Sequence, residues 1–593
     1  MIVAMDLVLD GDAGASQSVS GPVLELAAFV SDNAYGIKNF LCRATPYLTN
    51  KLTGTAFRSF GVVQTIQLTE TAIQHAWDAV HQTGLSDISA PAFRRKHFSD
   101  RMSDGNIPRA PLQYKSKIGW KNYGQGLREY KNMPKIWDAI MTKYEKVEEE
   151  CDKWNKDNKW RKRGVAVLPL RYGISFTFVE GNQGNARVAI YSGDGSVLVD
   201  HSGIEMGQGL ISRAMVACAA ELGVPMHFVR VGSFNTYSTP NAPGTGASTG
   251  TALSIPGVVQ AAQKLRATLT KLVDKEVDKM LKSSKDSGVL IHAWRNDPDE
   301  RTNAVNILNT VGKTSNGEHW ETSADAKNPW ALYTFLGDSW RIPVLKDEEI
   351  DEAQRRNARQ NDMWTTFVSS AYSQRKSLIK LGYSTPNADG NSDLSAVDIF
   401  YYFNYAATFS CVEVDCITGE ISVIRTDIHY DCGLSHNPAI DIGQVEGGFV
   451  QGLGNMLTES VTYDETTGAL VENSIMTYAI PDHRSIPQEF NVILTWEGGS
   501  KAISAEDSRT IQEKAAKVQV DKISRSKSTG EPPLVLASTV LFAARNAVRA
   551  ARRDHLGQND WLVNFQAPLL PPNMLEAIWG DKTCLDSRHN IEP

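Results

Sequence analysis

Four glycine-rich segments combine close backbone approach with polar side chains. They are 203–209 (GIEMGQG), 244–251 (GTGASTGT), 441–454 (DIGQVEGGFVQGLG) and 528–533 (STGEPP). Glycines and small hydroxyl residues before a helix let backbone N–H groups approach an anion, and the helix dipole adds to the attraction. Gln208 and Gln444 can both donate and accept hydrogen bonds, which suits a polar heterocycle. Taken singly, each segment could equally be a tight turn, a flexible loop or a helix-packing face.

One carboxylate, Glu531, stands directly before two prolines and an apolar helical pattern over 534–553. A carboxylate that is held near a helix start and shielded from water can act as a general base near neutral pH. The alternative is a helix cap, because the helix dipole favours an acidic side chain at this position. The residues alone leave both interpretations open.

Composition narrows the class of protein. The 593 residues, 41% hydrophobic and 22% charged, are typical of a globular protein with two or more subdomains. The net charge of −7 offers no basic excess for nucleic acid. The N-terminus lacks a basic leader and no run of eighteen apolar residues occurs, so we expect neither a signal peptide nor a membrane partner.

The cysteines indicate a reducing compartment and no protein-ligated metal. Seven cysteines are scattered without short paired spacings, so we expect a cytoplasmic protein. Cys411 and Cys416 invite an iron–sulfur interpretation, but the remaining ligands are absent at short spacing, which favours buried strand cysteines. No two histidines lie within four residues of each other, so no zinc motif is present.

The elements that would position these segments alternate without a regular βαβ rhythm, which favours an α+β fold. A polar stretch at about 276–360 is predicted to be a surface insertion. The other expected elements are a strand at 1–10, a helix through Trp77 and Val80, a charged helix within 142–163, two buried strands starting at Arg163 and Tyr172, a hairpin at Asp194-Gly195, a helix at 209–222, a strand at 411–416 and a helix at 534–553.

Together and in this order, the four segments resemble the molybdopterin-binding domain of the xanthine dehydrogenase and aldehyde oxidase family. The stretch from Asn437 to Gly454 matches the family pattern almost without change over its whole length. Upstream, Thr55-Ala-Phe-Arg-Ser-Phe-Gly61 resembles the TAFRGFG signature of the family. The resemblance covers nearly the whole chain apart from the insertion. It implies an oxidoreductase, a molybdenum hydroxylase.

The resemblance implies a role for each matching position. Glu531 would be the catalytic base of a hydroxylation in which water supplies the oxygen. Phe60, Phe176 and Thr177 would bind substrate, with the two phenylalanine rings on either side of a planar purine. The cofactor-binding positions would be Arg58, Met206, Gly207, Gln208, Ala247, Ser248 and Gln444. The pterin dithiolene would carry the molybdenum, so no protein metal ligand is expected.

Within the family, two segments favour a xanthine dehydrogenase-like enzyme. They are Gly173-Ile-Ser-Phe-Thr177 and Gly530-Glu-Pro-Pro533, whereas Ile204 occurs in some aldehyde oxidases. Hydroxylation of a purine, of the hypoxanthine or xanthine to urate type, is therefore expected, with an aldehyde oxidase-like hydroxylase as the alternative. The chain departs from the pattern at Ser59, which replaces a glycine, and at Val62-Val63, which replace Gly-Pro, with milder changes at Ser202 and Gly246.

The resemblance also implies that the chain is incomplete at its N-terminus. Residues 1–110 would be the C-terminal part of the first molybdopterin-binding subdomain, and 111–593 the second subdomain. The earlier half of the first subdomain and the 2Fe–2S and FAD domains would lie upstream or on a partner chain, in a family that is commonly dimeric. We therefore expect inactivity of this chain alone. A non-catalytic remnant that acts as a binding or scaffold protein is the further alternative.

Overall fold

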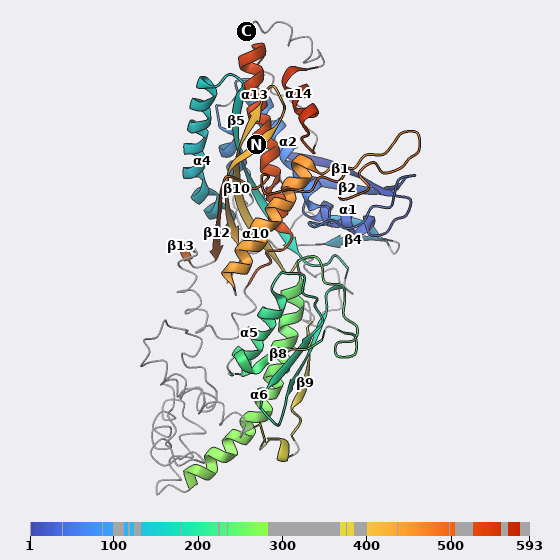
Figure 1. Cartoon of the computed structure of the whole chain (residues 1–593), viewed down its shortest axis with the longest axis vertical. Coiled ribbons are helices and arrows are strands. Elements are labelled where there is room, and N and C mark those ends of the chain that lie inside the picture. Colours follow the sequence, from blue (N-terminus) through green and yellow to red (C-terminus); the bar gives the residue numbers. More distant parts are fainter. Residues whose placement is uncertain are drawn as a thin grey trace. The chain divides into compact units, whose positions relative to one another are not determined.

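The computed structural model describes residues 2–98, 112–116, 119–123, 132–282, 368–384, 400–503, 526–558 and 567–580, apart from isolated positions and pairs within these ranges. The chain divides into two compact units (Figure 1). The first unit comprises Met1–Thr177, Asp389–Ser508 and Ser526–Pro593, and the second comprises Phe178–Ala388 and Arg509–Arg525.

The first unit is organised around a five-stranded sheet with the strand order β13-β12-β11-β10-β5. Strand β10 pairs antiparallel with both β5 and β11, and β11 pairs parallel with β12. The strands are β5 (Arg161–Ile174), β10 (Tyr402–Asp415), β11 (Ile421–Asp431), β12 (Glu489–Trp496) and β13 (Gly499–Ile503). Cys411 lies buried in β10, as predicted, whereas Cys416 is buried in the turn directly after the strand, so its predicted strand position is wrong.

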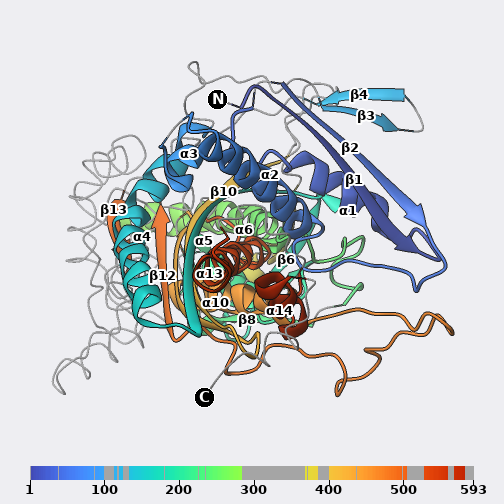
Figure 2. The same ribbon diagram turned by 90° about the horizontal axis from the view of Figure 1, so that it is seen from above.

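Two long helices cover opposite faces of this sheet, α4 (Asn132–Asp157) and α13 (Ser538–Leu556) (Figures 1 and 2). The α13 helix approaches β5 at Gly164, where an added Cβ would lie 2.1 Å from the Ala543 carbonyl oxygen. The continuous segment Pro532–Leu556 is long and apolar enough to cross a membrane, but 89% of its apolar window is buried inside the protein. It is therefore a core helix.

The segment predicted as two strands, starting at Arg163 and at Tyr172, is the single strand β5, so that prediction was wrong. Pro169 is tolerated because, among the described strands, β5 lies at one edge of the sheet and pairs with β10 alone. The charge of Arg171 is tolerated because its guanidinium donates to buried Asp32. Both residues interrupt the apolar pattern without interrupting the strand.

Further helices and two small sheets complete the first unit. The parallel pair β1 (Ala4–Gly14) and β2 (Asn39–Leu48) packs against α1 (Ser20–Phe29). The second small sheet is a hairpin of β3 (Leu112–Ser116) and β4 (Gly119–Tyr123). The further helices are, in chain order, α2 (Val62–Gln82), α3 (Ala90–Lys96), α10 (Pro438–Leu453), α12 (Pro532–Leu536) and α14 (Pro571–Trp579). A π-turn at Gly454–Thr458 follows α10.

The second unit is a four-stranded sheet, order β8-β7-β6-β9, with α5 (Leu210–Leu222) and α6 (Gly250–Lys282) packed on it. Its strands are β6 (Gly184–Ile190), β7 (Val197–His201), β8 (Val229–Val231) and β9 (Ile379–Ser384), with a short 3-10 turn at Met226–Phe228. The predicted hairpin is confirmed: β6 and β7 are antiparallel, and Gly195 has a φ of 71°. The predicted helix at 209–222 is confirmed as α5.

The two compact units divide the chain differently from the subdomain boundary predicted near residue 110, since residues 1–177 all belong to the first unit. That subdomain boundary stays a prediction. Of the predicted insertion at 276–360, the first residues belong to α6, which ends at Lys282, and the remainder lies outside the described residues. The mixture of sheets and packed helices in both units confirms the α+β class.

Candidate functional site

Glu531 occupies the N-cap position of α12, but its side chain makes no capping hydrogen bond. Its Oε2 instead accepts a hydrogen bond of 2.7 Å from the hydroxyl of Tyr172. The carboxylate therefore makes no capping hydrogen bond to α12, and its role as a base stays a prediction. The carboxylate is half-buried at a helix start, where the dipole favours its charged form.

Burial and two neighbouring side chains act on the pKa of Glu531. Burial raises the pKa of this carboxyl, while the hydrogen bond from Tyr172 and the positive charge of Arg58 act in the opposite direction. The result is a pKa above the ordinary value of 4.5, with burial as the dominant cause. A carboxylate in this environment is a stronger base than an exposed glutamate, as a general base near neutral pH requires.

Arg58 joins three segments that are far apart in the sequence. Its Nε and Nη2 donate to the carbonyl oxygen of Gly530, and its Nη1 donates to Oε1 of Gln451 in α10 at 3.1 Å. The Gly530 carbonyl precedes Glu531 directly, so Arg58 fixes the backbone that carries the carboxylate. Burial lowers the pKa of Arg58, and the charge of Glu531 opposes that effect.

The α10 helix is tied to the same segment. Thr529 donates a hydrogen bond of 3.2 Å to buried Asp441, in the first turn of α10. Gln444 was expected where a loop or strand enters a helix, and that expectation is wrong, because Gln444 lies half-buried inside α10. Gly443 and Gly447 stand on either side of it along the helix, and a Cβ added at either would meet no atom within 4 Å. This part of α10 is open to a ligand.

The segment that carries Phe60 has an unusual backbone. Ser59, Phe60 and Gly61 all have positive φ, at 85°, 48° and 89°. This conformation favours glycine, so the replacement of a glycine by Ser59 places a non-glycine residue in a strained position. Ser59 is nevertheless fully buried, and its carbonyl accepts from Val62 N at 3.0 Å and from the Tyr172 hydroxyl at 3.1 Å.

Phe176 and Thr177 follow β5 directly and are both half-buried. The Thr177 hydroxyl donates to Glu25 of α1 at 3.0 Å, and burial raises the pKa of that carboxyl. Arg58, Phe60, Phe176, Thr177, Gln444 and Glu531 all belong to the first unit. The stacking role of the two phenylalanines stays a prediction.

The remaining predicted residues lie in the second unit, where two loops are joined. The backbone N–H of Ile204 donates to the Thr245 hydroxyl at 2.9 Å, which connects segment 203–209 to segment 244–251. Ala247 and Ser248 have positive φ, at 49° and 55°, so both residues adopt the left-handed backbone conformation. The structure therefore brings Met206, Gly207, Gln208, Ala247 and Ser248 together within one unit.

The first of these loops is largely satisfied by its own side chains. Glu205 accepts 2.9 Å hydrogen bonds from the backbone N–H groups of Gly207, Gly209 and Ile211. These N–H groups were expected to face an anion, and that expectation is wrong for them, because the carboxylate of Glu205 already occupies the start of α5. Gln208 likewise donates from Nε2 to the Ile204 carbonyl at 2.7 Å.

The residues present fit a molybdenum–pterin cofactor in their chemistry. Gly443 and Gly447 in the first unit, and Gly207 and Gly244 in the second, leave open space where side chains would otherwise stand. The half-buried amide of Gln444 lies beside Gly443 and Gly447 and can pair with a polar ring, whereas the Gln208 amide is bonded to its own loop at both its nitrogen and its oxygen. Because the dithiolene binds the metal, such a site needs no protein thiolate.

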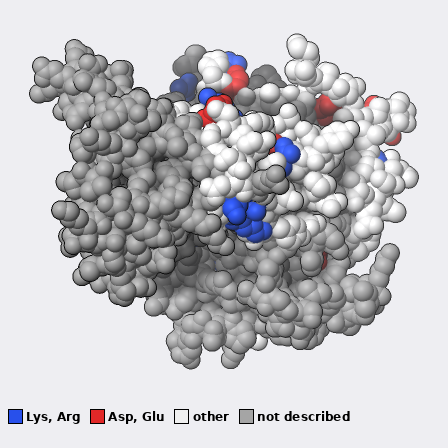
Figure 3. Space-filling model, turned by 90° about the horizontal axis from the view of Figure 1, so that it is seen from below, with Lys and Arg blue, Asp and Glu red and all other residues white. Residues whose placement is uncertain are grey.

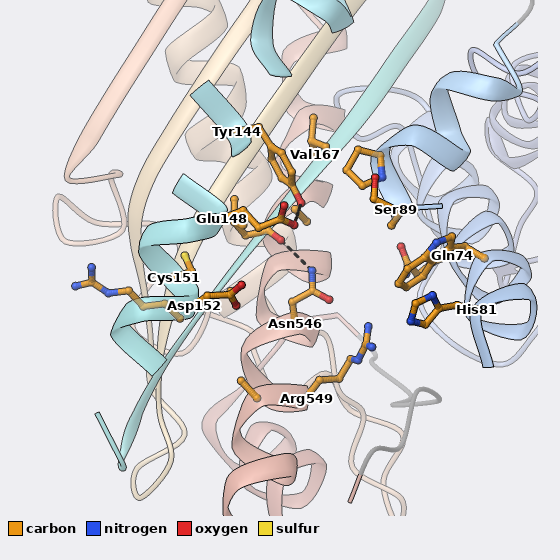
Figure 4. Close-up of a pocket in the computed structure, with 18 of the residues that line it drawn as sticks. Gln74, His81, Ser89, Tyr144, Glu148, Cys151, Asp152, Val167, Asn546 and Arg549 are labelled. Atoms are coloured by element: carbon orange, nitrogen blue, oxygen red, sulfur yellow. Dashed lines mark hydrogen bonds between the residues drawn. The ribbon is translucent and has the colours of Figure 1, made fainter. Parts of the chain in front are cut away.

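A separate cavity of about 600 Å³ lies in the first unit (Figure 4). It is lined from α4, α2 and α13, and none of the predicted site residues contributes to it. Its polar groups bind one another: Tyr144 donates to Glu148 at 2.7 Å, and Asn546 donates to the Val165 carbonyl at 2.9 Å. On the face drawn in Figure 3, the basic side chains of the described residues are scattered and form no continuous band.

Sequence reasoning missed two residues of this site. Tyr172, the partner of Glu531, sits in an apolar strand and gave no signal. Glu205 could have been found, because an acidic residue just before the first turn of a helix is a common helix-start signal.

Comparison with known proteins agrees with this fold. Residues 1–83 match one family described as a molybdopterin cofactor-binding domain, and residues 139–335 and 343–487 match a second family of the same description. The chain is 30% identical over 588 residues to xanthine dehydrogenase/oxidase of Mus musculus, covering 98% of this chain and 34% of that protein. It is 28% identical over 590 residues to xanthine dehydrogenase 1 of Arabidopsis thaliana, with 98% and 34% covered.

Solved structures show the same fold. Carbon monoxide dehydrogenase from Oligotropha carboxidovorans aligns with a TM-score of 0.62 at 17% identity, covering 97% of this chain and 59% of that one. Aldehyde oxidoreductase from Desulfovibrio gigas aligns with a TM-score of 0.60 at 17% identity, covering 97% and 47%. The chain belongs to the molybdenum hydroxylases of the xanthine dehydrogenase and aldehyde oxidase family, and its cofactor is molybdenum–molybdopterin. It spans about a third of the length of the curated relatives that it matches.

Proposed function

We propose that this chain supplies the molybdopterin-binding part of an enzyme that hydroxylates a purine or a closely related planar heterocycle. The observation that carries the proposal is the half-buried carboxylate of Glu531, which is raised in pKa, held by Tyr172 and unused as a helix cap. An aldehyde oxidase-like substrate is the second candidate, because Ile204 occurs in some aldehyde oxidases.

In this mechanism the bound molybdenum centre supplies the redox chemistry and the activated oxygen. In the first unit, Arg58 and Gln444 would hold the cofactor, and the cofactor-binding roles of Gln208 and Ser248 in the second unit stay predictions. Glu531 takes the proton of the attacking oxygen at its carboxylate. Phe60 and Phe176 would orient the planar ring and exclude water from it.

A partner polypeptide, or an upstream part of the same protein, would complete the enzyme. The parallel pair β1–β2 supports this, because a two-stranded parallel sheet has two open edges and is rarely stable alone. Val8, Leu41 and Tyr47 are each about half exposed on this pair. The 2Fe–2S and FAD domains would belong to the missing part. The free state of all six cysteines in the described residues suits the proposed cytoplasmic location.

The test is reconstitution with the upstream part of a related enzyme, followed by molybdenum and pterin analysis and by hypoxanthine, xanthine and aldehyde turnover. We expect metal and purine hydroxylation in the joint sample, and Glu531→Gln should abolish turnover while molybdenum content stays nearly unchanged. Aldehyde turnover alone would favour the second candidate. A joint sample without metal would favour a non-catalytic binding or scaffold protein.

Phe176→Ala tests the purine assignment separately. We expect weaker purine affinity at unchanged molybdenum content, because the variant loses one stacking face. Phe178→Ala, two residues further along and partly exposed, is the matched control. Unchanged purine kinetics in Phe176→Ala would overturn the stacking role.

A further inference from the structure

The hydroxyl of Tyr172 stands between two acceptors. Its oxygen lies 2.7 Å from Oε2 of Glu531 and 3.1 Å from the carbonyl oxygen of Ser59. A tyrosine hydroxyl carries one hydrogen and can donate fully to only one of these acceptors at a time. Tyr172 is only 1% exposed, so water offers its side chain little competition.

The strand that carries Tyr172 and the segment that carries Glu531 are both held by bonds that do not involve the Tyr172 hydroxyl. Strand β5 is fixed by its pairing with β10, where Tyr172 lies opposite Asn404. The Asn404 side chain donates to the Ser528 carbonyl at 2.9 Å, and the Tyr430 hydroxyl donates to the same carbonyl. The segment that leads to Glu531 is therefore anchored to β10 and β11, so the geometry around the hydroxyl is set by the sheet.

We propose that Tyr172 is a positioning residue for the base, whose hydroxyl hydrogen points to Glu531 when the carboxylate is ionised and to the Ser59 carbonyl when it is protonated. The inference rests on the proposed role of Glu531 as the base. When Glu531 gains a proton, its new O–H donates to the Tyr172 oxygen, and the tyrosine hydrogen turns to Ser59. No proton leaves Tyr172, and no covalent bond to it breaks.

This arrangement satisfies the buried carboxyl in both states. An unsatisfied buried polar group would favour a different rotamer of Glu531 after each proton transfer. With Tyr172 present, the same side-chain position serves before and after the reaction. The backbone at Ser59, with its φ of 85°, directs a carbonyl to the place where the second state needs it.

The charged and titratable groups around Glu531 agree with this role. Burial raises the pKa of Glu531, and the Tyr172 hydrogen bond and the Arg58 charge lower it. Burial and the charge of Glu531 raise the pKa of Tyr172 well above its ordinary value, so the hydroxyl remains protonated at neutral pH. Tyr430, on β11, adds to the raised pKa of Tyr172 and keeps its own proton for the same reason of burial.

The test uses the chain alone and needs no cofactor. The carboxyl band of Glu531 is identified in infrared difference spectra as the band that Glu531→Gln removes, and its titration is followed in wild type and in Tyr172→Phe. We expect the Glu531 midpoint to move to higher pH in Tyr172→Phe, because the ionised form loses its hydrogen bond. Tyr144→Phe is the matched control, since it removes a tyrosine bond to a different carboxylate, Glu148. An unchanged or lower midpoint in Tyr172→Phe would overturn the proposal.

A second variant should shift the Glu531 midpoint in the opposite direction. Incorporation of 3-fluorotyrosine at position 172 makes the hydroxyl a stronger donor without changing its shape, so the midpoint should move to lower pH. This experiment stays decisive if Tyr172→Phe does not fold. A midpoint that does not respond to the fluorinated residue contradicts the hydrogen-bond role.

In the completed enzyme, Tyr172→Phe should move the acidic limb of the kcat/KM pH profile to higher pH. At pH values below the Glu531 midpoint we expect kcat/KM to fall roughly tenfold, which corresponds to the loss of one hydrogen bond to a charged group. A merely structural role would lower kcat/KM equally at every pH. If the infrared midpoint moves but wild type never hydroxylates a substrate, the proposed function fails and the Tyr172–Glu531 coupling stands. If turnover occurs but neither midpoint nor acidic limb moves, this inference fails and the proposed function stands.

Discussion

Arg58 donates two hydrogen bonds to the carbonyl oxygen of Gly530, the residue that directly precedes Glu531 and that lies 472 positions further along the chain. A third bond reaches Gln451 in α10. Arg58 is therefore the point at which the segment before α2, the α10 helix and the segment that carries the candidate base are joined. Its planar fork of donors suits this task, because one side chain can serve several acceptors in fixed directions.

Arg58→Lys should weaken this junction even though it keeps the charge. A lysine ammonium cannot reproduce the two bonds to the Gly530 carbonyl oxygen together with the bond to Gln451. We expect the free energy of unfolding of the first unit to fall by about 1–3 kcal/mol, measured by urea denaturation. Arg484→Lys, at an exposed position, is the control and should have little effect. Equal stability of the two variants would show that the Arg58 bonds contribute little.

Glu531→Gln should change how stability depends on pH. Burial raises the folded-state pKa of Glu531 above 4.5, so the unfolded chain ionises first as the pH rises. Wild type therefore loses stability as the pH rises from about 4.5 through the raised pKa, and this loss stays constant above it. The variant lacks this ionisation. We expect the stability of Glu531→Gln relative to wild type to be higher at pH 8 than at pH 4.

Denaturant unfolding at a series of pH values measures this difference. The Tyr172 bond remains available to the glutamine oxygen, so the comparison isolates the charge. A relative stability that falls with pH would mean that the folded state lowers the Glu531 pKa, and the site would then hold a poor base at neutral pH.

The long elements could be predicted from the sequence because each buries a regular apolar pattern. The helix at 534–553, the hairpin at Asp194-Gly195 and the strand through Cys411 were expected on local grounds, and the structure contains all of them. Strand β5 was divided in two because Pro169 and Arg171 interrupt its pattern. Their tolerance depends on an edge position and on Asp32, 139 residues away, which local reasoning cannot supply.

The candidate site also has one part that could be predicted from the sequence and one part that could not. The glycine-rich segments were recognisable because glycine is needed wherever a ligand approaches the backbone, and the family resemblance gave them roles. The pair Tyr172–Glu531 joins residues 359 positions apart, and a tyrosine in a buried strand is usually a packing residue. Only the tertiary structure shows that its hydroxyl meets a carboxylate.

Glu205→Gln should loosen the first loop of the second unit. Burial alone would raise the pKa of Glu205, but hydrogen bonds from Ile211, Gly209 and Gly207 outweigh it and lower the pKa. Because the folded-state pKa is lowered, this stabilisation is present above the unfolded value of 4.5 and is lost as the pH falls through the folded value. A neutral glutamine has one acceptor oxygen for the three N–H donors and no charge for the helix dipole.

Amide hydrogen exchange measures this effect residue by residue. We expect faster exchange at Gly207, Gly209 and Ile211 in Glu205→Gln at pH 7, and about 1–2 kcal/mol lower stability of α5. Gln208→Ala is the comparison, because it removes a side-chain bond of the same loop and keeps the carboxylate. If exchange is faster in Gln208→Ala than in Glu205→Gln, the Gln208 amide, and not the Glu205 carboxylate, holds the loop in place.

Glu70→Gln should be the most destabilising of these substitutions. The Glu70 carboxylate is fully buried and accepts bonds from Asn33 at 2.8 Å, from the Tyr35 hydroxyl at 2.7 Å and from Arg94 at 3.0 Å. Arg94 forms an ion pair with Glu70, and the variant replaces this negatively charged partner by a neutral amide. Arg94 is itself only 3% exposed, so water cannot take the place of the lost charge. Breaking a buried ion pair on one side typically costs about 3–5 kcal/mol.

Urea denaturation of the first unit measures this loss, and Glu465→Gln, the same change at an exposed position, is the matched control. Because this cluster ties α2 to α3 and to the segment before β2, its loss should also expose the region of Arg58 to limited proteolysis. The opposite outcome is that Glu70→Gln and Glu465→Gln unfold at the same urea concentration. It would mean that the cost of desolvating Arg94 and Glu70 cancels their attraction, so that the ion pair determines conformation without adding stability.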